Sequence, residues 1–364
     1  MIRNRTVNTA QATSLFLLAL VVSLVPCGSR AQETVPPGVS VEKIWDQAQH
    51  NAFTDLIRWH DKFYCTFREG ERHVFGTDGQ VRVIASDDGR KWKSVALIAE
   101  KDVDLRDPKL SITPDDRLMI LMGGSYYKGK ELVRRLPRIA FLKPGEVGLS
   151  TSVPVEIDDS VASDNDWLWR VVWHQGIGYG TLYQAYYPPG AKPGYRTTDE
   201  RPWGFHLVQT TDGVHYDLTA TFDLGTAGEA TALFLEDGNM VIIARNDKLA
   251  DLGLSAPPYT TWKWQNLALR LGGPDLIRLP DGTIVLGTRV YEGPNGDTRH
   301  TVFGTLTLDG KFTEYVRVPS GSDTSYPGMV LYNNMLWASY YSNHEGRTSI
   351  FLAKMPLSLF QHDR

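Results

Sequence analysis

One hairpin-like pattern recurs along the whole chain. Residues 229–245 read EATALFLEDGNMVIIAR, which is two apolar β-type runs joined by a polar turn, with Glu229 at one end and Arg245 at the other. Two such runs around an Asp-Gly turn predict a β-hairpin. Related stretches begin at residues 54, 107, 169, 274 and 326, so the repeat is about fifty residues long.

Repetition of a strand-rich unit at this period predicts a β-propeller. The six copies indicate six blades, and because no long amphipathic helical pattern interrupts them, we expect an all-β fold. The stretch VSVEKIWDQ, residues 39–47, precedes the first copy. We hypothesise that it supplies the outer strand of the last blade and so closes the ring.

The N-terminus predicts export. Basic residues are followed by the apolar run SLFLLALVVSLV and then by PCGSRAQE, which together predict a secretory signal over residues 1–31 and a single propeller domain over residues 32–364. The alternatives are a membrane anchor, for which the run is short of the ~20 residues that span a bilayer, and a lipoprotein site at Cys27, for which Pro26 is a poor neighbour. We expect a secreted or periplasmic protein in which Cys65 has no disulfide partner.

Three short turns lie between the hairpins: SDDGRKW at 86–92, TTDGVHY at 210–216 and the fainter TLDGKFTEY at 307–315. A Ser or Thr, an Asp, a Gly and a following aromatic residue predict a turn held by its own side chains. These turns resemble the Asp boxes of sialidases and other propellers. We expect them to be structural and to lie away from the pocket.

The open ends of the hairpins are the expected site, because the innermost strands of a propeller line a central funnel. Glu229 and Arg245 can therefore face one pocket. Three hairpins end in an arginine, Arg68, Arg245 or Arg289, and converging guanidinium groups bind carboxylate, sulfate or phosphate. The alternative is that each arginine pairs with an acid of its own blade. The other candidate substrate contacts at hairpin ends are Asp55, Asp107, Trp169, Arg170 and Asp275.

Residues 45–355 resemble the sialidase family. The resemblance rests on EATALFLEDGNMVIIAR, on RLPDGTIVLGTR, on DTSYPGMV and on the Asp-box-like turns. It implies a six-bladed propeller of sialidase type in which Tyr326 is the nucleophile, Glu229 is its general base, and Arg245 and Arg289 belong to the arginine triad. A neutral phenol suits a substrate whose anomeric carbon carries a carboxylate, since that group would repel a carboxylate nucleophile. The alternative is that Tyr326 is an ordinary propeller aromatic.

The first blade departs from the family pattern. Sialidases open their first hairpin with Arg-Ile-Pro, whereas this chain has HNAFTDL there, so Arg68 is a candidate replacement from the other end of the hairpin. The family's acid/base aspartate comes from the following loop, here EGERHVFGTDGQ, which offers His73 and Asp78. His73 is a proton donor suited to neutral pH. Asp55 and His50 are further candidates.

Other motifs leave alternatives open. LRDPKL also resembles a motif of five-bladed furanosidases, so Asp107 either grips substrate hydroxyls or caps its strand. Tryptophans in DNDWLWR and YTTWKW either stack on sugars or pack between blades. They are Trp167, Trp169, Trp262 and Trp264. Residues 343–345 could rim the site.

The resulting expectation is an exported, monomeric glycoside hydrolase that removes a terminal acidic sugar from a glycan. The alternatives are a hydrolase of another anionic sugar, a propeller polysaccharide lyase with a Tyr or His base, and an acidic-sugar-binding propeller without catalysis. No cluster has zinc spacing, so we expect neither metal nor cofactor. A net charge of −4 argues against nucleic acid or anionic membrane as a partner.

Overall fold

The computed structural model describes residues 35–145, 148–185, 203–294 and 296–361. The expected signal segment, residues 1–31, lies outside the described residues. Residues 33–364 form one compact unit, and its strands are arranged in six sheets. Within the described part, the helical content is the 3-10 turn η1 (Leu357–Leu359), and no helix there is long and apolar enough to cross a membrane.

Each sheet is one blade, built from consecutive antiparallel strands. Blade 1 contains β2 (His50–Trp59), β3 (Lys62–Gly70), β4 (Gln80–Ser86) and β5 (Lys93–Ile98). Blade 2 contains β6 (Asp104–Ile112), β7 (Leu118–Lys128), β8 (Glu131–Leu142) and β9 (Val153–Pro154). Blade 3 contains β11 (Trp167–His174), β12 (Ile177–Gln184), β13 (Gly204–Thr210) and β14 (His215–Phe222), and the short β10 (Glu156–Ile157) pairs with β14 in parallel. Blade 4 contains β15 (Ala230–Phe234), β16 (Met240–Ala244), β17 (Asp251–Ser255) and β18 (Lys263–Asn266). Blade 5 contains β19 (Leu271–Arg278), β20 (Ile284–Glu292), β21 (Thr298–Leu306) and β22 (Phe312–Val318). Blade 6 contains β23 (Thr324–Tyr332), β24 (Met335–Ser342), β25 (Ser349–Pro356) and β1 (Ser40–Trp45).

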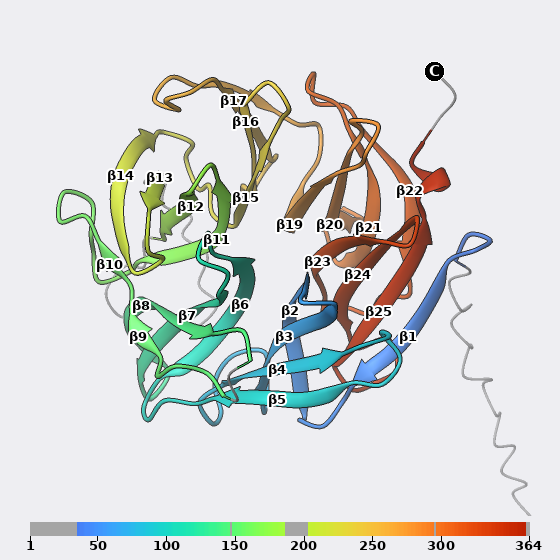
Figure 1. The fold of residues 1–364 in the computed structure, drawn as a ribbon, viewed down its shortest axis with the longest axis horizontal. Helices are drawn as coiled ribbons and strands as arrows, with labels where there is room; N and C mark the ends of the chain where they lie inside the picture. Colours follow the sequence, from blue (N-terminus) through green and yellow to red (C-terminus); the bar gives the residue numbers. More distant parts are fainter. Residues whose placement is uncertain (1–34, 146–147, 186–202, 295, 362–364) are drawn as a thin grey trace, which may run out of the picture. The chain divides into compact units, whose positions relative to one another are not determined.

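The first strands of the six blades form a closed ring. β2, β6, β11, β15, β19 and β23 contact one another in chain order, and β23 contacts β2. Figure 1 shows these strands nearest the centre of the molecule and the fourth strands at its edge. The structure therefore confirms an all-β, six-bladed propeller.

The last blade is completed from the other end of the chain. β1 pairs antiparallel with β25, with Ser40 opposite Lys354, and Val39 and Val41 pack against the apolar cluster around Phe351. The hypothesis that residues 39–47 supply the outer strand of blade 6 is confirmed. Pairing covers the outer edge of β25 and leaves the six-residue β1 as the edge strand of this blade.

The turns at residues 86–92 and 210–216 join the third and fourth strands of blades 1 and 3. The Asp88 carboxylate accepts hydrogen bonds from the backbone N–H groups of Arg90 and Lys91 at 2.8 and 3.1 Å. Asp212 does the same with Val214 and His215 at 2.7 and 2.9 Å. Each turn is therefore held by its own side chains.

The first and last blades meet in close contact. Phe63 of β3 stacks on Trp337 of β24 with ring centroids 4.5 Å apart, and the Thr54 hydroxyl donates to the Tyr326 carbonyl at 2.7 Å. Gly328 of β23 lies so close to blade 1 that a side-chain carbon there would overlap the backbone nitrogen of Leu56. The ring closes without space for a methyl group at this point.

Replacement of Gly328 by alanine should therefore destabilise the protein. Because the backbone of blade 1 must move, we expect the free energy of unfolding to fall by about 1–3 kcal/mol, measured by urea denaturation. The matched control is Gly228→Ala, where the nearest atom to the new methyl lies at an ordinary 3.4 Å. Equal stability of the two variants would contradict tight closure at Gly328.

Candidate active site

β-bulges interrupt the inner strands near one end of the propeller. A bulge places two residues of one strand opposite one residue of its partner and re-aims a side chain. Five of the six inner strands contain such a register shift, and β15 keeps its register. The shifts lie between Ala52 and Asp55 in β2, Arg106 and Lys109 in β6, Leu168 and Val171 in β11, Gly272 and Asp275 in β19, and Ser325 and Gly328 in β23.

The bulges bring together side chains from different blades. Phe53, Asp107 and Tyr326 have φ values of 65°, 47° and 49°, a left-handed conformation that is costly for bulky residues and is concentrated at functional sites. The Phe53 and Tyr326 rings lie 5.4 Å apart, and the Trp169 ring meets Tyr326 edge-on at 5.3 Å. The comparison of the hairpins in the sequence matched Asp55 to Tyr326. Because of the bulge, Phe53 occupies the position in blade 1 that Tyr326 occupies in blade 6.

Proline follows the bulge residue in three blades, as Pro108, Pro274 and Pro327. Proline has no N–H to donate to a strand ladder, so within sheets it occurs at edges or bulges. The dipeptides Asp-Pro, Gly-Pro and Tyr-Pro therefore mark in the sequence where these three of the five bulged strands bend.

Tyr326 and Glu229 form the central contact. The Tyr326 hydroxyl donates to Glu229 Oε1 at 2.5 Å, Arg245 Nη1 donates to the same oxygen at 2.6 Å, and the Gly273 N–H donates to Oε2 at 2.8 Å. Glu229 directly precedes β15 and Arg245 directly follows β16, with a backbone hydrogen bond between them. The acid and the base at the two ends of this hairpin therefore form an ion pair that holds the hydroxyl of Tyr326.

The pKa shifts place the proton on Tyr326. Burial would raise the pKa of Glu229, but the charges of Arg245 and Arg289 and the hydrogen bond from Tyr326 hold that pKa below its usual value. Burial, together with the negative charge of Glu229, raises the pKa of Tyr326 well above that of a free phenol. The pair is therefore a neutral phenol donating to an ionised carboxylate.

Two further guanidinium groups lie beside this pair. Arg289 bonds the Tyr291 hydroxyl at 3.0 Å and the Thr324 carbonyl at 3.2 Å, and its carbon Cζ is 5.4 Å from the centre of the Tyr326 ring. Arg106 of β6 lies over the Phe53 ring at 5.0 Å, and its nearest carboxylate, Asp104, is 4.0 Å away. Arg106, Arg245 and Arg289 thus surround Tyr326 from three blades.

Arg68 is engaged elsewhere. Its side chain is fully buried, with Nε and Nη2 bonded to Asp104 at 2.9 and 2.7 Å and Nη1 to the Arg72 carbonyl at 2.7 Å. Arg68 therefore forms a structural ion pair, but with an acid of the neighbouring blade and not with one of its own blade, as the alternative had expected.

Asp78 lies apart from the tyrosine and glutamate. It is exposed, and its pKa is raised by partial burial and by the charges of Asp104 and Asp102. No hydrogen bond or ion pair among the described residues joins it to Tyr326 or Glu229. Its position agrees with a turn residue.

The predicted contacts Asp55, Arg170 and Asp275 bond to one another. Arg170 Nη1 lies 3.1 Å from both Asp55 oxygens and 3.5 Å from Asp275. Asp55 also accepts the Leu110 N–H of blade 2 at 2.7 Å, and Asp275 accepts the Met329 N–H of blade 6 at 3.1 Å. These charges fasten neighbouring blades together.

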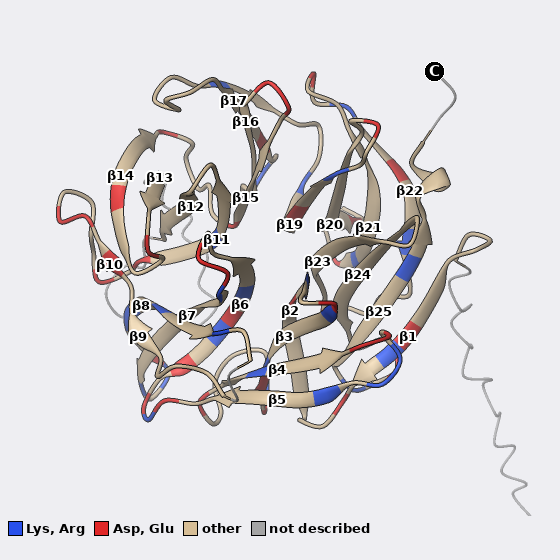
Figure 2. Ribbon diagram, in the orientation of Figure 1, with Lys and Arg blue, Asp and Glu red and all other residues tan. Residues whose placement is uncertain are grey.

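Lys109 is a buried cation that the sequence analysis did not single out. It follows the bulge of β6, two residues beyond Asp107, and Figure 2 shows acidic and basic positions on this strand. Its Nζ lies 4.7 Å from the centre of the Trp169 ring and bonds the Thr54 and Pro108 carbonyls at 3.3 and 3.2 Å. Burial lowers its pKa to about 8 against the attraction of Asp55.

The remaining tryptophans differ in their surroundings. Trp169 is buried, and its indole N–H has no partner among the described groups. Trp262 and Trp264 stack on each other at 5.4 Å and both contact Phe222, which agrees with packing. Asp107 is also buried, with Oδ1 unpartnered in the described structure, and burial raises its pKa.

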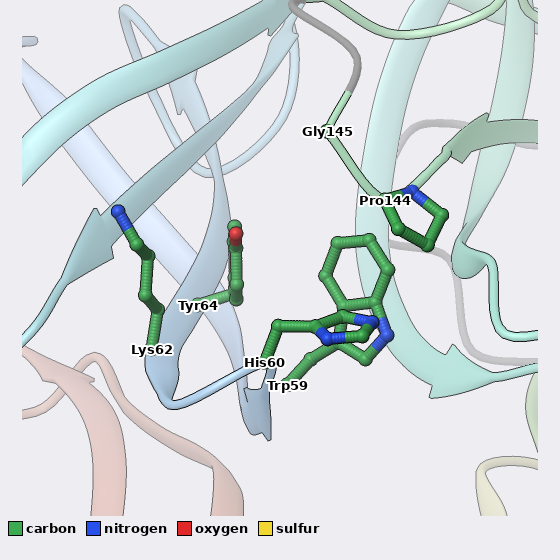
Figure 3. A pocket seen from close by; sticks show the side chains of 6 residues that line it. All are labelled: Trp59, His60, Lys62, Tyr64, Pro144 and Gly145. Carbon is green, nitrogen blue, oxygen red and sulfur yellow. The ribbon is translucent and has the colours of Figure 1, made fainter.

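A separate pocket of about 390 Å³ lies at the turn end of the first hairpin, lined by Trp59, His60, Lys62, Tyr64, Pro144 and Gly145. Figure 3 shows the Trp59 and His60 rings beside each other, with Lys62 and Tyr64 on the facing strand. His60 and Trp59 both bond Asp116, at 2.8 Å each. This pocket is at the opposite end of β2 and β3 from Tyr326.

Solved structures with a similar fold include sialidases and a protein of unknown function. The protein of unknown function from Dyadobacter fermentans matches with a TM-score of 0.73 at 16% identity, covering 88% of this chain and 100% of that one. The Trypanosoma rangeli sialidase matches with a TM-score of 0.68 at 13% identity, over 89% of this chain and 60% of that one. The propeller is of the sialidase type. Hadza microbial sialidase Hz136 follows with a TM-score of 0.64 at 11% identity, over 86% and 67%.

At these identities the likeness establishes the fold of the sialidase-type propeller. The chain spans about 60% of the length of the Trypanosoma rangeli enzyme. No family model matches the sequence, and no curated protein matches it.

The buried Lys109 predicts a pH dependence of stability. Its pKa is about 8 in the folded protein against 10.5 for an exposed lysine, so between these pH values the unfolded chain binds more protons and stability rises with pH. The free energy of unfolding of the wild type, minus that of Lys109→Met, should increase by on the order of 3 kcal/mol across this window. Urea denaturation at several pH values measures it, and a pH-independent difference would contradict the assignment.

Replacement of Arg68 and replacement of Arg106 should lower the free energy of unfolding by different amounts. Arg68→Met leaves the Asp104 carboxylate buried without its partner, so the free energy of unfolding should fall by about 3–5 kcal/mol. Arg106→Met removes a 13% exposed side chain whose ion pair with Asp104 is 4.0 Å long but whose charge also acts on the buried Asp107, so its cost should be smaller, at about 1–2 kcal/mol. Denaturation of both variants checks this, and an equal loss would assign Arg106 a structural role.

Proposed function

We propose that this protein is a retaining exo-glycosidase that removes a terminal acidic sugar, sialic acid or a related sugar, from glycans through Tyr326. The observation that carries the proposal is the neutral Tyr326 hydroxyl donating at 2.5 Å to the ionised, arginine-held Glu229. In that arrangement Glu229 takes the phenol proton as the oxygen attacks the anomeric carbon. Tyrosine nucleophiles are known among the sialidases.

The charge of the site supports an anionic sugar. Three guanidinium groups, those of Arg106, Arg245 and Arg289, lie around Tyr326, and within the described part of the chain Arg245 alone of the three has a carboxylate at hydrogen-bonding distance. A carboxylate ligand supplies the missing negative charge to Arg106 and Arg289. In this proposal Arg106 of blade 2 does the work of the first arginine that HNAFTDL lacks.

The solved neighbours supply the comparison substrates. The Trypanosoma rangeli sialidase has been solved with sialic acid, with the inhibitor DANA and with 2,3-difluorosialic acid as a covalent intermediate. The proposal extends to export of the mature chain from residue 32, to a monomer without cofactor, and to the self-bonded turns at 86–92 and 210–216 being Asp boxes.

Covalent trapping tests the proposed nucleophile. Incubation of the protein with 2,3-difluorosialic acid, or with 2,3-difluoro-KDN, should add one sugar to Tyr326, seen by intact mass and peptide mapping. Tyr326→Phe should show no adduct and should lose about 10³-fold or more in kcat/KM on an aryl α-sialoside, because the attacking oxygen is gone. The matched control is Tyr340→Phe, whose buried hydroxyl bonds the Pro319 carbonyl.

The other outcomes separate the alternatives. Turnover of an aryl uronide or of an acidic polysaccharide, with silence on the sialoside, would replace sialic acid by another anionic sugar. A product absorbing in the ultraviolet would indicate a lyase. Binding without turnover of any of these substrates would contradict catalysis and leave an acidic-sugar-binding propeller.

A further inference from the structure

A second cluster of titratable groups, formed by the buried His50, the half-buried Asp323 and the exposed His73, lies next to Phe53. Asp323, in the segment before β23, accepts a hydrogen bond from His50 Nε2 at 2.7 Å and lies 3.1 Å from His73 Nδ1. The three residues come from the segment before blade 6, the first strand of blade 1 and the loop after β3. Asn343 holds the Asp323 backbone from both sides, at 3.1 Å each. The carboxylate is therefore fixed in place.

The protons of this cluster can be assigned. Burial would raise the pKa of Asp323, but the hydrogen bonds from His50 and His73 hold it well below its usual value, so the carboxylate is ionised and only accepts. Both facing histidine nitrogens must then be donors. Burial lowers the pKa of His50, which makes His50 a neutral donor that anchors Asp323.

His73 is left with one free nitrogen. Its Nδ1 donates to Asp323, and among the described residues no hydrogen bond uses Nε2. The side chain is 46% exposed, and its ring meets Phe53 edge-on at 4.9 Å, with Phe53 itself 5.4 Å from Tyr326. The charge of His73 also acts on Asp107, whose carboxyl pKa it lowers against the effect of burial. His73 thus lies between solvent and the residues around Tyr326.

We propose that His73, oriented by Asp323 and His50, is the acid/base of the glycosidase reaction. This inference rests on the proposed function and names the proton carrier of that same site. In the first step the Tyr326 oxygen bonds to the anomeric carbon and its proton passes to Glu229, while the glycosidic bond breaks and the leaving oxygen takes the proton from His73 Nε2. In the second step His73 takes a proton from water, whose oxygen bonds to the anomeric carbon, and Tyr326 leaves and recovers its proton from Glu229. Asp323 and His50 are positioning residues.

Asp78 and Asp107 fit the role of acid/base less well than His73. Asp78 is exposed, and the described residues show no hydrogen bond or ion pair that joins it to Tyr326 or Glu229. Asp107 is buried beside Arg106 and Lys109, away from the solvent that the leaving group must enter, which suits it to a sugar hydroxyl.

The same trio also has the composition of a metal site, since its ligand atoms lie within 4.8 Å of one another, although no zinc spacing in the sequence indicated it. A metal-bound histidine normally donates from its other nitrogen to a second partner. His50 Nδ1 is buried without such a partner among the described groups. The hydrogen-bonded assignment is therefore favoured, and metal binding becomes an outcome of the test.

The test compares leaving groups in His73→Gln. Because a poor leaving group needs the proton and a nitrophenolate does not, kcat/KM on an alkyl α-sialoside should fall about 10²–10⁴-fold, while the release of the first equivalent of nitrophenol from a nitrophenyl α-sialoside should fall less than about tenfold. Azide, which needs no general base, should then restore turnover and give a glycosyl azide. His73→Asp keeps an ionisable group and should recover part of the alkyl sialoside activity. If another acidic sugar is the substrate, its alkyl and nitrophenyl glycosides replace the sialosides.

Two controls make the outcome specific. His60→Gln alters a histidine that is also bonded to an aspartate, Asp116 at 2.8 Å, at the far end of the same hairpin, and should leave all rates unchanged. Asp323→Asn should lower kcat/KM on the alkyl α-sialoside more than on the nitrophenyl α-sialoside, because His73 then loses the ionised acceptor that orients its Nδ1–H. The charged and titratable groups that face His73 are His50, Asp107 and Asp323.

The failures are distinguishable. If the wild type turns over no acidic glycoside and Tyr326 is not labelled, the proposed function fails and this inference falls with it. If the wild type is active but His73→Gln has the leaving-group dependence of the wild type, only the inference is overturned. Loss of wild-type activity with EDTA and its return with Zn²⁺ would replace the proton carrier by a metal site.

Discussion

A bulge in an inner strand is the constraint on which the site depends. A regular strand alternates its side chains between the two faces of its blade, so it presents few of them along the axis of the ring. The bulges at Phe53, Asp107 and Tyr326 break this alternation with positive φ values, and the proline after two of these residues removes a donor that would be left unpaired. The surrounding blades must compensate for this backbone strain. The buried cluster of Asp55, Arg170 and Asp275 does so, since its carboxylates bond the N–H groups of the next blades.

The electrostatics of the site follow from this arrangement. A buried Glu229 would be protonated in apolar surroundings, and it stays ionised because Arg245 and the Gly273 N–H occupy its oxygens together with the hydroxyl of Tyr326. Burial and the negative charge of Glu229 together raise the pKa of Tyr326. The two groups therefore set each other's protonation, so that at neutral pH the phenol of Tyr326 is uncharged and the carboxylate that accepts its hydrogen bond is ionised.

The sequence predicted the architecture better than the site. Hairpin turns repeating at about fifty residues predicted six blades, and VSVEKIWDQ predicted the closing strand, because both are local patterns of period and turn chemistry. Arg68 shows the limit of this reasoning: it ends its hairpin as Arg245 and Arg289 do, but Asp104 of the next blade determines where its guanidinium points. The comparison of hairpins in the sequence also misplaced one position, because it did not recognise the bulge in β2: Phe53, and not Asp55, is equivalent to Tyr326. Asp323 and His50 are 273 residues apart in sequence, and no spacing rule relates them.

The closing strand has a consequence for how the chain acquires its site during folding. Ser40 pairs with Lys354, so the ring cannot close before nearly the whole chain has been made. Tyr326 belongs to the last blade, while Phe53, His50 and His73 belong to the first, and these residues meet only across the closing junction. Contacts of such long sequence separation form late and slowly. A partly folded chain can hold four or five finished blades and still have no assembled site, so assembly of the site reports completion of the ring rather than the folding of any single blade.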